Sequence, residues 1–369
     1  MKRILVFCAV VTLCVSFAAC GIKNTSFESS GQITASITND NNTFVPYDES
    51  FDNVADSTSD GKTTSDTVAA AIPTPGEKQV LYLWEEGNAP AATEYTVNNG
   101  RYSDDPDFRP YLTYFPVPEG IKIKGAVLIC AGGAFQYRSD WNEGSPVAEE
   151  LSKLGYQSFV VDYRLLPYTQ EEGALDLARA VRFVRHHAQE YGIDEQDIAV
   201  MGFSAGGILA GEMLRNFDGI VSPTVLDPDY VPDALDEVSA DAAADGMIYS
   251  FYGRLSVGTA DVESLRKADL PPTFYCFGTH DPFYEQFLAN ADAVETAGTP
   301  VERLQLDGMP HGFGYQGDWI NEYDQFLTRV FTENSSYSHV SGLWWHSHYS
   351  KVMIRKEVLY GICNFKQWN

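Results

Sequence analysis

Basic side chains are scarce in this sequence. Its 369 residues include 25 Lys and Arg against 51 Asp and Glu, which gives a formal net charge of −26. Nucleic-acid binding requires a basic face that neutralises phosphates, so this balance argues against DNA or RNA as a partner. We interpret the acidic excess as a source of solubility.

Cysteine is also scarce, and its distribution does not suggest a disulfide framework. Of the six cysteines, two lie in an N-terminal hydrophobic stretch and Cys363 lies near the C-terminus. Cys130 and Cys276 lie in apolar segments, where a free cysteine packs as a small hydrophobe. The sequence contains no H-E-x-x-H metal motif and no phosphate-binding loop, so we expect no metal and no cofactor.

A hydrophobic run long enough to span a bilayer is missing as well. The apolar run at residues 4–17 has fourteen residues, which is too short for a transmembrane helix. It follows Lys2 and Arg3 and ends at Phe17-Ala18-Ala19-Cys20, which is typical of a bacterial lipoprotein signal. Residues 1–20 therefore predict export, with lipidation of Cys20 as the sole membrane anchor of a cell-surface or periplasmic lipoprotein. The alternative is ordinary signal cleavage, in which Cys20 has no role.

Composition divides the rest of the chain into three parts. Residues 21–78 are rich in Ser, Thr, Asn and Asp and lack apolar periodicity, so they predict a disordered tether. Residues 79–333 carry the patterns of a folded domain. Residues 334–369 form an atypical aromatic and basic tail, with three of the six Trp. We expect that tail to be disordered or a read-through artefact, with a sugar-binding patch as the alternative.

Within the folded part, short apolar segments alternate with helical periodicities. Segments 125–133 and 156–164 are apolar and β-branched, as expected for strands buried on both faces. Further strand patterns occur at 197–202, 245–253, 271–278 and 300–306, and helical patterns at 144–155, 174–192, 204–216, 283–298 and 321–331. The alternation predicts the α/β class, with a mostly parallel central sheet and helices on both faces.

One serine lies where such a sheet would carry its reactive groups. The stretch Gly202-Phe203-Ser204-Ala205-Gly206 fits G-x-S-x-G, in which the serine occupies a sharp strand-to-helix turn. Ser204 directly follows a predicted strand, and ligand-binding residues of parallel sheets gather at the carboxyl ends of strands. We therefore interpret Ser204 as a candidate nucleophile.

A nucleophilic serine needs a base and an orienting carboxylate, which follow it in the order acid and then His in this type of fold. His311 lies in a loop between the last predicted strand and the last predicted helix. Asp281 follows the strand at 271–278. His280 adjoins that acid and would point to the other side, so we interpret it as a surface residue and keep it as the alternative base.

Backbone donors for a developing oxyanion are also expected. The stretch "CAGGAF" (130–135) ends a strand and opens a loop, and the N–H groups of its Gly132 and Gly133 could point into a pocket. The N–H of Ala205 lies at a helix start, where the helix dipole favours negative charge. Two other features, the Asp162-Tyr163-Arg164 stretch and Trp84, are interpreted as structural rather than as substrate contacts.

The ordered motifs carry a family resemblance that covers residues 80–331. The stretches "AVLICAGGAFQYRSDWNEGSPVAEELSKLGYQSFVVDYRL", "AVMGFSAGG", "THDPF" and "MPHGFG" resemble bacterial α/β-hydrolase esterases of the acetyl esterase and acetyl-xylan esterase type. The resemblance implies the α/β-hydrolase fold. It also implies a catalytic triad and an oxyanion hole, formed by Ser204, Asp281 and His311 and by Gly133, Ala134 and Ala205, respectively. The chain has Cys130-Ala131 where the family often has Pro-Gly, which leaves the second donor less defined.

These features predict a serine carboxylic ester hydrolase. Little chain separates the Ser204 helix from the strand at 245–253, which leaves little room for a lid and favours short acyl groups, as in acetylated sugars or polysaccharides. One alternative is another triad hydrolase, such as a peptidase, lactonase or formamidase, since fold does not fix substrate. The other is a non-catalytic, carbohydrate-binding surface lipoprotein, although such a module has no use for the ordered triad.

Overall fold

An eight-stranded sheet organises the part of the chain that the structure describes. This computed structural model describes residues 78–340. The strands lie in the order β1-β2-β4-β3-β5-β6-β9-β10, antiparallel at β1, β2 and β4 and parallel from β4 to β10. The sheet strands are β1 (Gln79–Tyr82), β2 (Tyr111–Phe115), β3 (Gly125–Cys130), β4 (Tyr156–Asp162), β5 (Ile198–Phe203), β6 (Ala244–Ile248), β9 (Thr273–Gly278) and β10 (Val301–Leu306).

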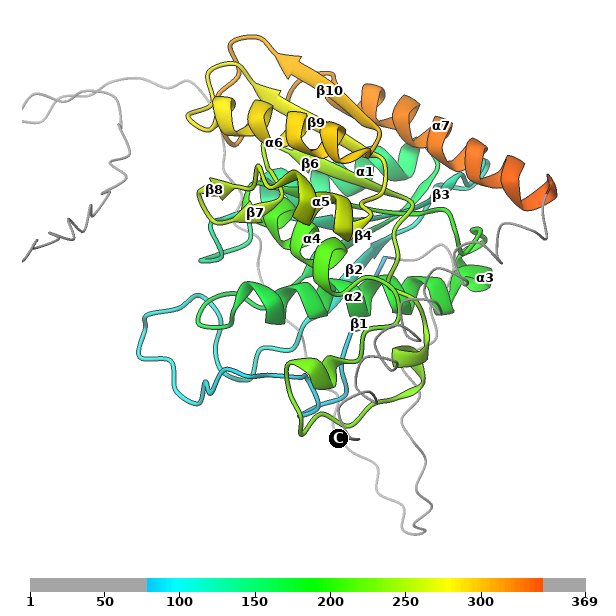
Figure 1. Cartoon of the computed structure of the whole chain (residues 1–369). Helices are drawn as coiled ribbons and strands as arrows, with labels where there is room; N and C mark the ends of the chain where they lie inside the picture. Colours follow the sequence, from blue (N-terminus) through cyan, green and yellow to red (C-terminus); the bar gives the residue numbers. More distant parts are fainter. Residues whose placement is uncertain (1–77, 341–369) are drawn as a thin grey trace, which may run out of the picture. The chain divides into compact units, whose positions relative to one another are not determined.

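Helices cover both faces of this sheet. Those against one face include α1 and α7, while α2, α4 and α6 lie on the other (Figure 1). The α-helices are α1 (Ser145–Lys153), α2 (Gln170–His186), α3 (Ala188–Tyr191), α4 (Ala205–Asn216), α5 (Val262–Ala268), α6 (Tyr284–Ala297) and α7 (Trp319–Val340). A π-helical turn (Asp140–Gly144) precedes α1, two 3-10 turns (Pro223–Val225 and Ala234–Glu237) follow α4, and the strands β7 (Gly253–Arg254) and β8 (Val257–Gly258) form a small hairpin.

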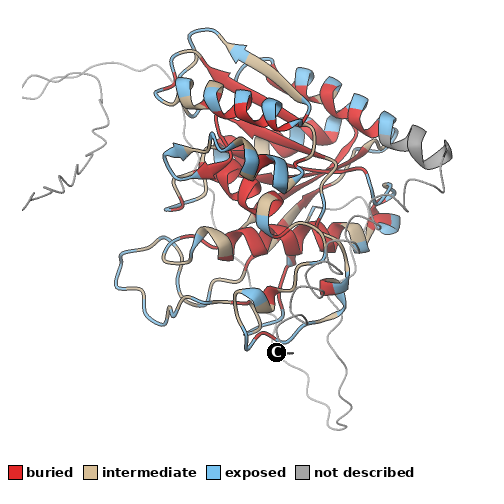
Figure 2. Cartoon of the chain, viewed as in Figure 1, coloured by how far each residue is buried: buried red, intermediate tan, exposed pale blue. Residues whose placement is uncertain are grey.

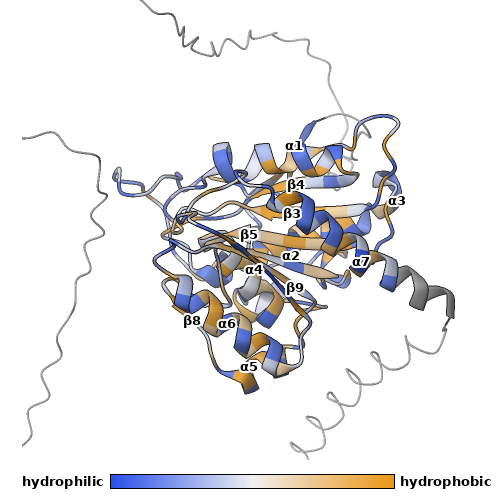
Figure 3. Ribbon diagram, turned by 90° about the horizontal axis from the view of Figure 1, so that it is seen from above, coloured by the Kyte–Doolittle hydropathy of each residue, from blue (hydrophilic) through white to orange (hydrophobic). Residues whose placement is uncertain are grey.

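The central strands are buried because helices pack on both of their faces. Every residue of β3, β5, β6 and β9 is buried, and these strands appear red in Figure 2. Figure 3 shows the matching hydropathy, with orange strands such as β3 between helices that carry blue turns. Burial on both faces explains why these strands are continuous apolar runs rather than alternating patterns.

Local signals fix the ends of the helices beside the sheet. Thr169 and Glu172 form a reciprocal capping box at the start of α2. Helix α1 has Pro146 in its first turn, and α6 ends at Gly298 with φ +106. These signals mark where α1 and α2 begin and where α6 ends.

The α/β-hydrolase fold expected from the sequence is confirmed, with differences at its edges. The antiparallel strands β1 and β2, the β7–β8 hairpin and α5 were not expected. The strand expected over 245–253 ends at Ile248, because Tyr249 has a left-handed backbone with φ +36. The closing helix α7 continues to Val340, beyond the domain end expected at 333.

Other expectations fall partly or wholly outside these residues. The expected export signal (1–20), the tether as far as residue 77 and the tail after Val340 lie outside the described residues. Within the described part, Cys130 and Cys276 are buried free thiols. No helix between residues 78 and 340 is long and apolar enough to cross a membrane.

Candidate active site

Ser204 occupies the turn between β5 and α4. Its backbone has φ +48 and ψ −118, a conformation that L-residues rarely adopt. The turn brings neighbouring backbone segments close together. A Cβ on Gly202 would lie 2.3 Å from the Gly206 carbonyl carbon, and a Cβ on Gly206 would lie 2.1 Å from the Cys130 carbonyl oxygen. Both positions therefore require glycine, which is the physical origin of the G-x-S-x-G pattern.

Three side chains from separate loops form one hydrogen-bonded chain. His311 Nε2 lies 2.9 Å from Ser204 Oγ, and His311 Nδ1 lies 2.7 Å from Asp281 Oδ2. Asp281 is buried, and its other carboxylate oxygen accepts the Phe283 N–H at 2.8 Å. A buried carboxylate in this position orients the imidazole, and the imidazole can then accept the hydroxyl proton.

The sheet topology brings these loops together. Asp281 follows β9 and His311 follows β10, and the carboxyl ends of adjacent parallel strands meet at one edge. The two loops are in close contact, because a Cβ on Gly278 would lie 2.0 Å from the Met309 carbonyl oxygen. The His280 backbone N–H donates to that same carbonyl at 3.1 Å, and the His280 residue is exposed. The structure thus brings His311, and not His280, to Ser204.

Backbone N–H groups are available beside the serine. The loop after β3 turns through Gly133 (φ +130) and Ala134 (φ +55), and Ala205 is the first residue of α4. Within residues 78–340, no backbone carbonyl or side chain accepts a hydrogen bond from the N–H of these three residues. The loop lies against the serine, since a Cβ on Gly132 would lie 3.0 Å from Ser204 Cβ. Preorganised donors of this kind can stabilise an oxyanion.

Glu143 and Tyr249 also belong to this site, and the sequence did not point to them. Glu143 Oε2 accepts the Gly132 N–H at 2.6 Å, which occupies a donor that the sequence had offered to an oxyanion. Glu143 Oε1 accepts the Tyr249 hydroxyl at 2.6 Å. Burial raises the pKa of the Glu143 carboxyl and holds the pKa of the Tyr249 hydroxyl well above its usual range. An acid just before a helix is a common surface pattern, so no sequence signal distinguishes Glu143.

The structural roles expected for Arg164 and Trp84 agree with their contacts. The Arg164 guanidinium forms a buried ion pair with Asp176 at 2.9 Å. The Trp84 indole N–H donates to the same carboxylate at 2.7 Å. Asp162 lies 3.1 Å from Arg138, in the loop after β3. These charges join the N-terminal segment, β4 and α2 without contacting Ser204 or His311.

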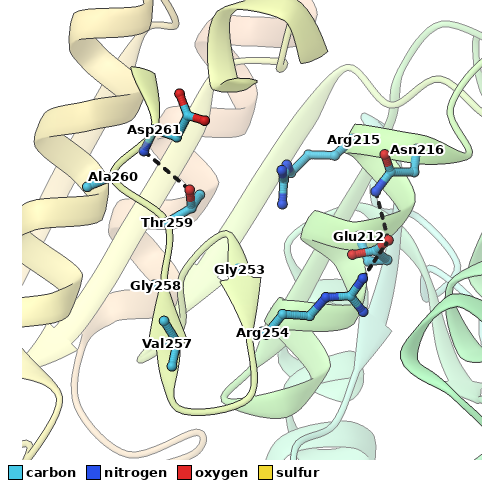
Figure 4. A pocket seen from close by; sticks show the side chains of 10 residues that line it. All are labelled: Glu212, Arg215, Asn216, Gly253, Arg254, Val257, Gly258, Thr259, Ala260 and Asp261. Atoms are coloured by element: carbon cyan, nitrogen blue, oxygen red, sulfur yellow. Dashed lines mark hydrogen bonds and ion pairs between the residues drawn. The ribbon is translucent and has the colours of Figure 1, made fainter. Parts of the chain in front are cut away.

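A separate cavity lies away from these residues. It has a volume of about 540 Å³ and is formed by the end of α4 and the β7–β8 hairpin. Figure 4 shows Glu212 of α4 paired with Arg254 of the hairpin, while the Arg215 side chain extends away from this ion pair. None of the residues that line this cavity is Ser204, Asp281 or His311, so it is distinct from the candidate active site.

Comparison with known proteins places the chain in a family. Residues 127–314, just over half of the 369 residues, match the α/β hydrolase fold family, and the chain belongs to that family.

The curated relatives include proteins named as ester hydrolases. An acetylxylan esterase of Xylanibacter ruminicola is 26% identical over 260 residues, which cover 67% of this chain and 52% of that protein. An ethyl acetate hydrolase of Pseudomonas putida is 27% identical over 246 residues, covering 60% of this chain and 76% of that protein. The chain thus spans about half the length of the acetylxylan esterase that it matches.

Among solved structures, the chain is similar to an acetyl ester-xyloside bifunctional hydrolase from Caldicellulosiruptor lactoaceticus. The TM-score is 0.53 at 22% identity, and the match covers 72% of this chain and 99% of the other. At this level of identity the likeness concerns the fold alone.

Proposed function

We propose that this chain is a serine carboxylic ester hydrolase that removes short acyl groups, with acetylated sugars or polysaccharides as its substrates. The observation that carries the proposal is the Ser204–His311–Asp281 chain with its distances of 2.9 and 2.7 Å beside the available N–H groups of Gly133, Ala134 and Ala205. The acetylxylan esterase and ethyl acetate hydrolase relatives support the choice of ester and of acyl group.

In the proposed mechanism, His311 accepts the Ser204 proton as Oγ attacks the ester carbonyl carbon. Asp281 holds the imidazole in the required tautomer and stabilises the imidazolium that forms. The free N–H groups bind the oxyanion of the tetrahedral intermediate. His311 then protonates the leaving alkoxide oxygen as its bond to carbon breaks. A water molecule, deprotonated by His311, hydrolyses the acyl-enzyme and restores the Ser204 hydroxyl.

Two exposed aromatic residues favour a carbohydrate ester. Tyr137 and Trp141 lie in and directly after the loop of the expected oxyanion hole, and they are 52% and 76% exposed. Tyr and Trp rings combine an apolar face with a polar group, which suits them to ligand contacts at a surface. The apolar faces of pyranose rings are suited to stacking on such rings.

Single substitutions test the proposal. In the full-length chain, Ser204→Ala and His311→Ala should each lower kcat on p-nitrophenyl acetate by at least about 10⁴-fold, because triad members act as a unit. His280→Ala, a matched control in the adjacent loop, should retain wild-type turnover. A fluorophosphonate should label the wild type and not Ser204→Ala. Turnover only on peptide, lactone or formamide substrates would contradict the ester assignment, and full activity of Ser204→Ala would contradict the triad.

We also propose that the protein is an exported lipoprotein, anchored through a lipid on Cys20. The charged start, the fourteen-residue apolar run and the Phe17-Ala18-Ala19-Cys20 sequence support this proposal. After expression in a bacterium with labelled palmitate, the wild type should carry the label and sediment with membranes. Cys20→Ser should lose both properties, and a wild type recovered unlabelled in the soluble fraction would contradict the proposal.

A further inference from the structure

Two loops of the site are joined by a short π-helical turn. This turn (Asp140–Gly144) follows the loop that carries Gly133 and Ala134. Its Asn142 side chain donates to the Gly312 carbonyl at 3.1 Å, and its Asn142 carbonyl accepts the Tyr315 N–H at 3.2 Å. Because Gly312 directly follows His311, these hydrogen bonds attach the π-helical turn to the His311 loop.

The next residue of the turn, Glu143, binds the loop after β3. Glu143 is 5% exposed, and its two carboxylate oxygens accept hydrogen bonds from two different segments. One bond comes from the Gly132 N–H at 2.6 Å, immediately before Gly133. The other comes from the Tyr249 hydroxyl at 2.6 Å, just after β6. Charge-assisted bonds to a buried carboxylate are the stronger kind, so Glu143 fixes both segments.

Tyr249 completes the connection to the base. Its hydroxyl oxygen accepts the Gly314 N–H at 3.2 Å. Its ring lies edge-on to the His311 imidazole, with centroids 4.9 Å apart, and against Phe313 at 4.6 Å. A continuous path therefore runs from Gly132 through Glu143 and Tyr249 to the loop of His311.

We infer that Glu143 is a positioning residue. Through Tyr249, it fixes the position of the oxyanion-hole loop relative to the His311 loop. This inference rests on the proposed ester hydrolysis and deepens it. Glu143 does not reach the reacting atoms itself. It acts by fixing the Gly133 and Ala134 N–H groups relative to the His311 imidazole. A displacement of either by about 1 Å can lower the rate by about 100-fold.

Two opposing influences act on the Glu143 pKa. The attraction between the Glu143 carboxylate and the His311 imidazolium lowers the Glu143 pKa against the rise caused by burial. Tyr249 and Tyr163 are the other titratable groups that interact with Glu143, and burial holds both hydroxyls neutral at working pH.

Three variants separate geometry from charge. Glu143→Ala removes the connection and should lower kcat on p-nitrophenyl acetate by about 100-fold, with KM within a few-fold of wild type. Glu143→Gln can still accept the Gly132 N–H and donate to Tyr249, so it should recover at least about 10-fold of that loss. Tyr249→Phe keeps the ring beside His311 but loses the hydroxyl bonds, and should lower kcat by about 10-fold.

A second tyrosine on the same segment supplies the matched control. The Tyr252 hydroxyl donates to the buried Asp245 carboxylate at 2.7 Å, as Tyr249 does to Glu143, but it has no contact with His311 or the loop after β3. Tyr252→Phe should lower the unfolding temperature about as much as Tyr249→Phe and leave kcat and KM unchanged. All rates are measured on the full-length chain and divided by the folded fraction, determined by circular dichroism.

The outcomes distinguish this inference from the function on which it rests. A wild type without Ser204-dependent turnover contradicts both. Ser204-dependent turnover that stays within twofold of wild type in Glu143→Ala and Tyr249→Phe contradicts the positioning role alone. An equal loss of kcat in Tyr249→Phe and Tyr252→Phe also contradicts it, because a general packing defect then accounts for the effect.

Discussion

Backbone strain in the described residues is concentrated around the candidate site. Six non-glycine residues between residues 78 and 340 have positive φ. Four of them lie in the loops of the site: Ala134, Phe135, Ser204 and Tyr249. Such conformations cost about 1–3 kcal/mol each and persist only where surrounding contacts hold them. The Phe135 carbonyl accepts the Leu166 N–H at 2.9 Å, and the Ser204 N–H donates to the Ile248 carbonyl at 3.1 Å. Hydrogen bonds to β6 and to the loop after β4 thus stabilise a site that local preferences disfavour.

Individual site residues differ in how far the sequence could reveal them. Ser204, Asp281 and His311 were predictable because their order along the chain and their places after strands follow from the topology. Glu143 was not, because its role arises from contact with Tyr249, which is 106 residues away in sequence. The sequence also offered Gly132 as an oxyanion donor, and only the structure shows that Glu143 occupies its N–H.

Among the elements, the parallel strands were the most predictable. Strands β3, β5 and β9 are buried along their whole length, so each is a plain apolar run. The edge strand β1 has four residues of mixed exposure and carries no such run. The two-residue strands β7 and β8 are too short for any periodicity. Pattern-based prediction therefore succeeds in the parallel part of the sheet and weakens toward the antiparallel edge at β1 and in the short hairpin.

The segment between α4 and β6 bears directly on substrate size. It is tied to α2 by ion pairs, Arg179 to Asp233 at 2.6 Å and Arg182 to Asp236 at 3.3 Å. The ring of Tyr230 in this segment packs edge-on against Trp84 in the N-terminal part. These contacts hold the segment on α2 and not on the His311 loop, which agrees with the expectation that it does not serve as a large lid.

Without such a cover, we expect the enzyme to prefer short acyl groups. Each additional methylene could contribute up to about 0.8 kcal/mol of binding, but only where an apolar groove receives it. Rates on p-nitrophenyl esters of two to twelve carbons should therefore fall beyond about four carbons, and acetate should be released from acetylated xylan. Ser204→Ala supplies the background rate for each substrate. A kcat/KM that rises steadily toward twelve carbons would show that a long acyl groove exists.

At the scale of the whole molecule, an acidic sequence contains several Asp carboxyl groups whose pKa is raised by burial. Burial raises the pKa of Asp245 in β6 to about 7 and that of Asp162 at the end of β4 to about 6. Burial, with a contribution from Asp241, raises the pKa of Asp218 to about 7. The net charge of −26 adds repulsion that grows as these groups ionise.

These raised pKa values set the direction of the pH dependence of stability. In the unfolded chain an Asp titrates near pH 4, so between about pH 4 and 7 the folded state binds more protons than the unfolded state. The free energy of unfolding therefore falls as pH rises through this window, by about 1.4 kcal/mol for each unit of pKa difference in a given group. We expect a higher unfolding temperature at pH 5 than at pH 8 for the full-length chain, measured by calorimetry. Asp245→Asn keeps an acceptor for the Tyr252 hydroxyl but cannot ionise, so it should reduce this difference. Two results would contradict this expectation: an unfolding temperature that rises from pH 5 to pH 8, or an Asp245→Asn variant that leaves the difference between the two pH values unchanged. Either result would show that these carboxyl groups do not control the pH dependence of stability.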